Sequence, residues 1–248
     1  MSQVRSGIST IIVALMVLFL AAASSASGAP LSAATTTIEE RVCDIAADTA
    51  LGLGDYRTAI ELHQRLLQSD RNLAIAHYHL GFAYGMLGHS TEEINEYRMA
   101  IGLGLKHWDL FLNLGLAYFD QHEITSATTA LETAVSLGPD HAETHFNLAV
   151  VYERENRLNE ALQQIIASLV LAPEDLDAAN TDAIICARMG DIVSARKIWT
   201  QLTQAAPEYI PARTNLATLD HSCGDACGTY VHSYRTMVLS PLLDSEVK

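Results

Sequence analysis

Basic residues are scarce in this chain of 248 residues, because 15 Lys and Arg stand against 29 Asp and Glu, for a formal charge of −14. Such an acidic surface does not suit nucleic acid, whose phosphates attract basic patches, and it is repelled by anionic lipid headgroups. A basic partner, or solubility alone, fits this charge better. Aromatic residues are few, at 6%, but apolar residues make up 49% of the chain, enough for a continuous core.

The sequence motifs of common catalytic sites are missing. There is no Gly-x-Ser-x-Gly, no Gly-rich phosphate loop and no His-Glu-x-x-His. His141 and His145 are four residues apart, and His77 and His79 are close together, but a metal site needs a third ligand and Glu143 should point to a different helix face. We therefore expect no enzyme, no cofactor and no metal site, with a metal-dependent enzyme as a distant alternative.

Long apolar runs are also absent, except near the N-terminus. Residues 2–7 are polar with one base, Arg5, and the stretch Ile8–Ala23 that follows is apolar apart from one Ser and one Thr. Small residues fill Ala21–Ala29. A basic start, an apolar stretch and small residues at a cleavage site together predict a secretory signal.

We place this signal at residues 1–28 and a flexible lead-in at 29–39. The alternative is an uncleaved anchor, because Thr10–Ala23 approaches the short end of a membrane span. Under the first interpretation the protein is exported, periplasmic or secreted. Under the second it is attached to a membrane and faces outside the cytoplasm.

Proline is rare too, but four of the six prolines stand 34 residues apart, at Pro139, Pro173, Pro207 and Pro241. Other residues share the spacing. The stretch Leu114-Gly115-x-x-Tyr118 is echoed by Leu148-Ala149-x-x-Tyr152 after it and by Leu80-Gly81-x-x-Tyr84 before it. A fixed period of this length indicates a repeat architecture. Within each period two amphipathic helical patterns are separated by a polar or Gly break, which predicts a helix–turn–helix unit.

The pattern resembles the tetratricopeptide repeat (TPR), a helix–turn–helix of 34 residues. The resemblance covers residues 40–243, before a short tail at 244–248, and it is strongest in the third and fourth units. It implies an all-α fold, a right-handed α-solenoid of about six units, which we call repeats. Their first residues are Glu40, Ala74, Trp108, Ala142, Leu176 and Ile210.

Particular residue types at fixed positions support the repeat frame. Gly54, Gly88 and Gly190 suit the turn between the two helices, where a positive φ costs glycine least. Large side chains at one position of the second helix are expected to fill the space between repeats: Tyr97, Leu131, Ile165 and Trp199. Glu93 stands where other middle repeats have Ala, so we expect looser packing there.

The four cysteines are not expected to form a network. Cys43 and Cys186 belong to the first and fifth repeats, too far apart for a bridge, which requires Cα atoms within about 7 Å. We expect both to be small core residues. Cys223 and Cys227 flank a short turn in the sixth repeat, where either a local disulfide or two free thiols is possible.

In the family that the chain resembles, the first helix of each unit lines a concave groove that binds a partner. The matching positions in repeats two to four predict an apolar groove with an acidic margin. The other interpretation is that the large residues simply pack on the adjacent repeat. The groove residues that we select are Tyr78, Phe82, Met86, Asp109, Leu112, Leu116, Phe119, Glu143, Phe146, Val150 and Arg154.

The acidic margin argues against one known use of the family. Units that hold the acidic C-terminal tail of a chaperone resemble each other in carrying Lys or Arg in the groove, whereas this chain places Asp109, Glu143 and Asp177 there. An acidic tail would be repelled. The resemblance thus implies a non-catalytic scaffold that binds a protein or peptide outside the cytoplasm, in envelope assembly or secretion. The alternative is a permanent structural subunit of a membrane-associated complex.

Overall fold

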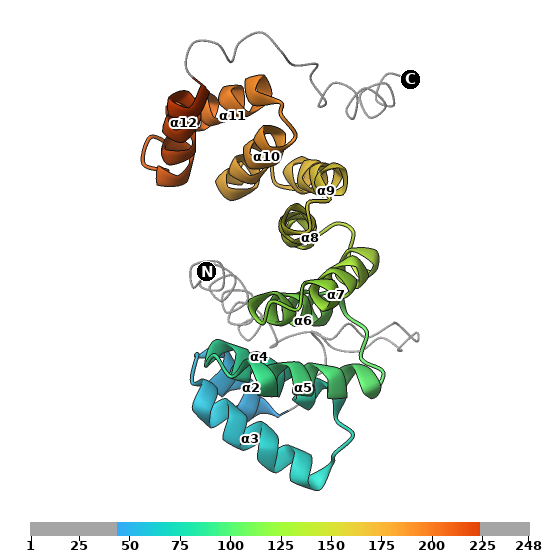
Figure 1. Ribbon diagram of the computed structural model, residues 1–248. Helices are drawn as coiled ribbons and strands as arrows, with labels where there is room; N and C mark the ends of the chain where they lie inside the picture. Colours follow the sequence, from blue (N-terminus) through green and yellow to red (C-terminus); the bar gives the residue numbers. More distant parts are fainter. Residues whose placement is uncertain (1–43, 224–248) are drawn as a thin grey trace, which may run out of the picture. The chain divides into compact units, whose positions relative to one another are not determined.

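The computed structural model describes residues 44–223, which form eleven α-helices and no strand (Figure 1). The all-α prediction is confirmed. The first helices of successive repeats alternate with the second helices along the chain. In order they are α2 (Ile45–Gly52), α3 (Tyr56–Ser69), α4 (Ala74–Met86), α5 (Ser90–Gly102), α6 (Trp108–Asp120), α7 (Ile124–Leu137), α8 (Ala142–Arg154), α9 (Leu158–Leu171), α10 (Leu176–Arg188), α11 (Ile192–Ala205) and α12 (Ile210–Cys223).

The 34-residue period is visible in the helix boundaries. Helices α4, α6, α8, α10 and α12 begin at residues 74, 108, 142, 176 and 210, the residues at which the sequence pattern starts each repeat. None of these described helices is long and apolar enough to cross a membrane. The predicted signal or anchor, the lead-in and the tail at 244–248 lie outside the described residues.

The turn between the two helices of a repeat has the same backbone conformation in five repeats. Gly54, Gly88 and Gly190 have φ angles of 76°, 78° and 86°. At the equivalent positions His122 and Asn156 adopt φ angles of 61° and 62°. The left-handed turn therefore belongs to the repeat, and two repeats form it without glycine.

Small residues allow the helices of a repeat to approach closely. The side chains of Ala59, Ala127, Ala161 and Ala195 on the second helices are 0% exposed. A Cβ atom on Gly81 would lie 2.7 Å from the ring of Tyr97, so the missing side chain is what admits the tyrosine. Helices α4 and α5 therefore pack at a distance that only glycine permits at this point.

Glu93 does not loosen the second repeat as we expected. Its side chain is only 3% exposed, and its carboxylate occupies the space beside Gly85. A Cβ atom on Gly85 would lie 2.4 Å from Glu93 Oε1. A glycine on the first helix thus compensates for the larger residue on the second.

The described residues divide into two compact bodies, the first ending at Ala117 and the second beginning at Tyr118. We call them the N-terminal and C-terminal bodies, and the division falls within α6. The N-terminal body has a core cluster that includes Leu51, Ala59 and Phe82. The C-terminal body has one that includes Cys186, Trp199 and Leu219.

Candidate functional site

In the N-terminal body, several predicted groove residues lie in the core. Phe82 is 9% exposed and packs with Leu51 and Ala59 of the first repeat, and its ring makes an edge contact with Tyr56 at 6.3 Å between centroids. Met86 is half-buried against the same cluster. These two side chains therefore contribute to packing between the first and second repeats.

The acidic margin of the N-terminal body is engaged in hydrogen bonds. The buried Tyr78 hydroxyl donates to Asp109 Oδ2 at 2.6 Å, and His107 Nδ1 lies against Asp109 Oδ1. Burial, with the Asp109 charge second, raises the pKa of Tyr78 well above its usual value. On the same helix as Asp109, Leu112 is 2% exposed and Leu116 is half-buried. Asp109 is thus a structural acceptor as well as a surface charge.

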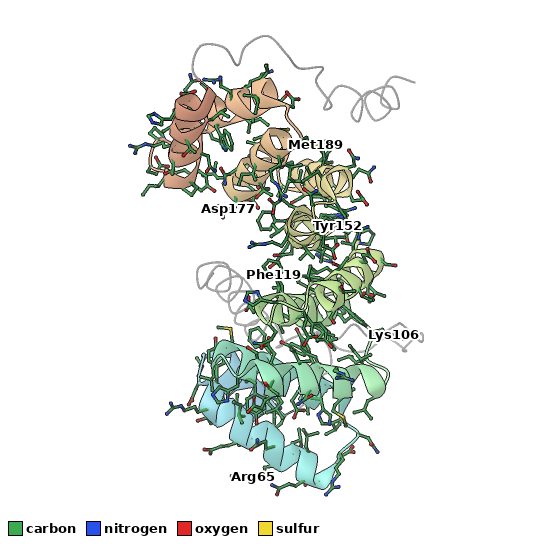
Figure 2. All side chains as sticks on the ribbon, in the orientation of Figure 1. Arg65, Lys106, Phe119, Tyr152, Asp177 and Met189 are labelled. Atoms are coloured by element: carbon green, nitrogen blue, oxygen red, sulfur yellow. The ribbon has the colours of Figure 1, made fainter. Side chains whose placement is uncertain are left out.

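In the C-terminal body, the predicted residues keep exposed surface. Phe119, Glu143, Phe146 and Val150 are half-buried, and Arg154 is exposed. The guanidinium carbon of Arg154 lies 5.9 Å from the centre of the Phe119 ring, a cation–π distance. Figure 2 shows Phe119 near the end of α6. The ends of helices α6 and α8 are therefore neighbours on one face.

A second set of contacts joins α8 to α10. Arg188 Nη1 donates to the main-chain oxygen of Glu153 at 2.6 Å and also contacts its carboxylate. Arg188 Nη2 donates to Asn156 Oδ1 at 2.9 Å. Together with the Phe119–Arg154 contact, these bonds join the ends of three successive first helices. We call Phe119, Arg154 and Arg188 the inner row.

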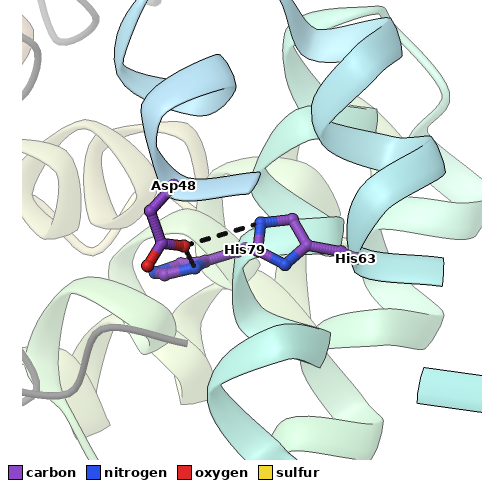
Figure 3. A group of neighbouring side chains, drawn as sticks. All are labelled: Asp48, His63 and His79. Atoms are coloured by element: carbon purple, nitrogen blue, oxygen red, sulfur yellow. Dashed lines mark ion pairs between the residues drawn. The ribbon is translucent and has the colours of Figure 1, made fainter. Parts of the chain in front are cut away.

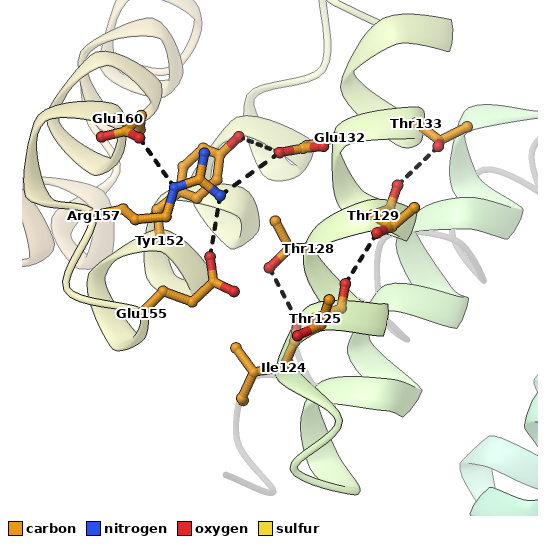
Figure 4. Close-up of polar contacts among 10 residues, drawn as sticks. All are labelled: Ile124, Thr125, Thr128, Thr129, Glu132, Thr133, Tyr152, Glu155, Arg157 and Glu160. Carbon is orange, nitrogen blue, oxygen red and sulfur yellow. Dashed lines mark hydrogen bonds and ion pairs between the residues drawn. The ribbon is translucent and has the colours of Figure 1, made fainter.

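A separate polar network joins α7 to α8 (Figure 4). The Tyr152 hydroxyl donates to Glu132 Oε1 at 2.7 Å, and the guanidinium of Arg157 lies 4.2 Å from the tyrosine ring centre. Arg157 also donates to Glu155 and Glu160. Burial, followed by the bond to Glu132, raises the pKa of Tyr152 to about 12. This network keeps the hydroxyl protonated and fixes the third repeat against the fourth.

One histidine of each pair singled out in the sequence contacts protein groups through both ring nitrogens. His77 Nδ1 pairs with Glu96 at 2.6 Å and its Nε2 lies 3.2 Å from the Arg71 carbonyl. His145, at the same repeat position, makes the same two kinds of contact, with Gln164 and the Pro139 carbonyl. Both histidines therefore connect a second helix to the preceding loop.

His79 has different neighbours from His77, and the sequence pattern did not reveal them. Its Nδ1 lies 2.9 Å from Asp48 Oδ1, and its ring centre is 5.2 Å from that of His63. Asp48, His63 and His79 come from three different helices. A comparison of equivalent repeat positions could have singled out Asp48 and His63, because each stands where other repeats carry apolar residues.

The cysteine predictions are tested only for Cys186. Its side chain is 3% exposed and lies in the core cluster of the C-terminal body, as expected of a small core residue. Cys43 and Cys227 lie outside the described residues, so the proposed bridge between Cys223 and Cys227 stays a prediction.

The last described helix carries a surface hollow. It runs along one face of α12 and is lined by Ile210, Arg213, Thr214, Ala217, Thr218 and His221. Ile210 is 67% exposed there. The rest of the sixth repeat, which the sequence predicts to extend to residue 243, lies outside the described part of the chain.

Residues 112–182 match the tetratricopeptide repeat family. No curated protein matches the sequence. The fold is similar to that of YrrB, a TPR protein described as having an unusual peptide-binding site, with 22% identity and a TM-score of 0.64 over 68% of this chain and 87% of YrrB.

The fold is also similar to MamA. One MamA structure has 21% identity and a TM-score of 0.61 over 71% of this chain and 98% of that protein. MamA from Desulfovibrio magneticus RS-1 has 17% identity and a TM-score of 0.61 over 66% of this chain and 92% of its own. Identities this low establish the fold alone. The prediction of an α-solenoid of TPR units is thus confirmed, and residues 112–182 carry the sequence of the tetratricopeptide repeat.

Proposed function

We propose that the protein is a non-catalytic scaffold that binds a protein or peptide segment outside the cytoplasm, in envelope assembly or secretion. The observation that carries the proposal is the inner row of the C-terminal body. Its side chains are held in place by neighbours and still expose apolar and cationic surface. The likeness of the fold to YrrB, a TPR protein with an unusual peptide-binding site, supports it.

Fixed side chains favour binding because little conformational freedom is lost when a partner arrives. Phe119 is the aromatic member of the inner row, and aromatic residues with exposed faces often supply most of the affinity of an interface. Glu143 and Asp177 give the same helices an acidic character. We therefore propose a partner segment with an apolar anchor on Phe119 and with basic or neutral residues beside Glu143 and Asp177, and not an acidic tail.

The signal-like N-terminus supports the location outside the cytoplasm, and it is tested separately. Mass spectrometry of the exported protein should find a mature N-terminus between Ser25 and Pro30. A product that retains Met1–Ala23 would contradict cleavage and favour the anchored form.

The binding face can be tested with a photocrosslinking amino acid placed at residue 119 in cells. The matched control is residue 170 on α9, because Val170 is an apolar side chain that is 73% exposed on a second helix. We expect a defined crosslinked partner from position 119 and none of the same mass from position 170. Equal products from both positions would contradict the proposed face.

The dissociation constant of the purified partner then measures how much Phe119 contributes to the binding free energy. Burying a whole Phe side chain contributes about 1.5–3 kcal/mol, and Phe119 is already half-buried in the free protein. With the cation–π contact to Arg154 included, Phe119→Ala should weaken binding about tenfold, whereas Val170→Ala should not. A large fall in melting temperature with binding unchanged would mean that Phe119 only packs the repeats. A partner that copurifies at fixed stoichiometry and cannot be removed would support the permanent structural subunit instead.

A further inference from the structure

Three side chains that can bind metals meet in the N-terminal body (Figure 3). Asp48 lies on α2, His63 on α3 and His79 on α4, so each comes from a different helix. One ligand atom from each lies within 4.8 Å of the other two. Asp48 Oδ1 is 2.9 Å from His79 Nδ1 and 3.8 Å from His63 Nε2.

These distances are close to those of a zinc site. Bonds of 2.0–2.1 Å in a tetrahedral arrangement place neighbouring ligand atoms about 3.3 Å apart. The two separations from Asp48 lie on either side of that value. Because no pair exceeds 4.8 Å, none has to close by more than about 1.5 Å. Rotation of the imidazole rings can provide such an adjustment.

Within the described part of the chain, both histidines have buried nitrogen atoms that make no hydrogen bond. His63 is 0% exposed, and among residues 44–223 neither of its ring nitrogens has a hydrogen-bond partner. His79 Nδ1 is also buried, and its contact with Asp48 lacks hydrogen-bond geometry. By contrast, both ring nitrogens of His77 and of His145 are bonded. Buried polar atoms without partners are rare because each is costly.

Comparison of equivalent positions in successive repeats shows that two of the three residues differ in type from those of the other repeats. His63 stands where the next four repeats have Tyr97, Leu131, Ile165 and Trp199, all buried and large. Asp48 stands where those repeats have Phe82, Leu116, Val150 and Ile184. Two apolar positions of the first repeat have thus been replaced by side chains that can coordinate a metal, and both face His79.

We propose that Asp48, His63 and His79 bind one transition-metal ion of the zinc class and thereby tie α2 to α3 and α4. Two imidazoles and one carboxylate form a donor set suited to zinc, whereas magnesium and calcium prefer oxygen ligands only. The Asp48 side chain is 19% exposed, which leaves an entry path and a position for a water ligand.

The ion would serve a structural purpose. Helix α2 has only eight residues, and isolated helices this short are marginal in water. Its first turn is capped by the Asp44 side chain, which accepts from the amides of Ala46 and Ala47. Asp48 lies in this same first turn, so a metal bound through it would fix the start of α2 to the rest of the body.

The test uses untagged, full-length mature protein that has been stripped with a chelator and dialysed. Calorimetric titration with Zn²⁺ should show one ion per chain with about micromolar affinity or tighter. Co²⁺ should give the visible absorption of a tetrahedral site, and Mg²⁺ should not bind. Saturating zinc should raise the melting temperature, because a ligand of the folded state stabilises it.

Variants decide whether these three residues form the site. Asp48→Asn and His79→Gln should each weaken zinc binding by at least about tenfold. His77→Gln is the matched control, because His77 is buried on the same helix but bonded to Glu96 and the Arg71 carbonyl. Circular dichroism confirms that each variant folds.

Several outcomes would overturn the proposal. Zinc binding that survives in both site variants, or falls equally in His77→Gln, would place the ion elsewhere. Weak binding of several ions would indicate surface histidines only. No binding at all would mean that the cluster is a buried histidine–carboxylate contact without a metal.

Discussion

The turn at His122 offers a direct test of how much a repeat loses when it lacks the usual glycine. His122 is exposed, and its backbone has a φ angle of 61°, in the left-handed region. This conformation costs a residue with a Cβ atom about 1–2 kcal/mol. Glycine avoids that cost, but it gives the unfolded chain more freedom, an opposing effect of about 0.5–1 kcal/mol. We expect His122→Gly to stabilise the protein by about 0.5–1 kcal/mol.

The control is the reverse change at the same turn of another repeat. Gly88 has a φ angle of 78°, and a Cβ atom built there meets nothing within 4 Å. Gly88→Ala should therefore destabilise through backbone conformation alone, by about 1 kcal/mol. Asn156→Gly should gain less than His122→Gly, because asparagine tolerates this region and Asn156 Oδ1 accepts from Arg188.

Urea unfolding, followed by circular dichroism, gives the midpoint and the slope for each variant. A stabilisation of this size corresponds to a rise of about 1–4 °C in melting temperature for a chain of this length. A loss of stability in His122→Gly, or no change in Gly88→Ala, would refute the idea that the left-handed turn limits the stability of these repeats.

Two further predictions concern buried groups. Gly85→Ala should destabilise by about 1–3 kcal/mol in urea unfolding, because its Cβ atom would lie 2.4 Å from Glu93 Oε1, and adding Glu93→Ala should restore most of the loss. In metal-free protein, the free energy of unfolding should fall by up to about 3 kcal/mol as the pH drops from 6.5 to 4. Burial lowers the pKa of His63 to about 4 in the folded protein, so in this range the unfolded chain binds a proton at His63 and the folded protein does not. His63→Phe should flatten this pH dependence, and an unchanged profile would contradict it.

The fold could be predicted from the sequence because each repeat is a local unit. Five described first helices begin at residues that the 34-residue spacing identifies. The glycines at the turn predicted a left-handed backbone conformation, and Gly54, Gly88 and Gly190 adopt it. A pattern that recurs six times averages out the ambiguity of any single segment, and contacts between neighbouring repeats follow from the period.

Side-chain contacts were harder to predict, because the period fixes where a residue lies but not what it touches. Phe82 and Phe119 both belong to the predicted inner face, yet Phe82 is buried against the first repeat and Phe119 remains half-exposed beneath Arg154. Glu93 was expected to loosen the packing, but Gly85 on the facing helix leaves room for its carboxylate. In both cases the outcome depends on a partner in another helix, at a position that the pattern does not link.

His77 and His79 lie only two residues apart on one helix, yet their side chains have different kinds of neighbours. The ring of His77 is satisfied by Glu96 and a loop carbonyl, an arrangement that His145 repeats two repeats later. His79 faces Asp48 and a fully buried His63, an arrangement that depends on two departures from the repeat. A side chain that follows the repeat finds equivalent partners in another copy of the motif, as His77 and His145 do, whereas one that departs from the repeat needs a partner of its own. In a repeat protein, therefore, the departures are where a specific ligand or partner should be sought first.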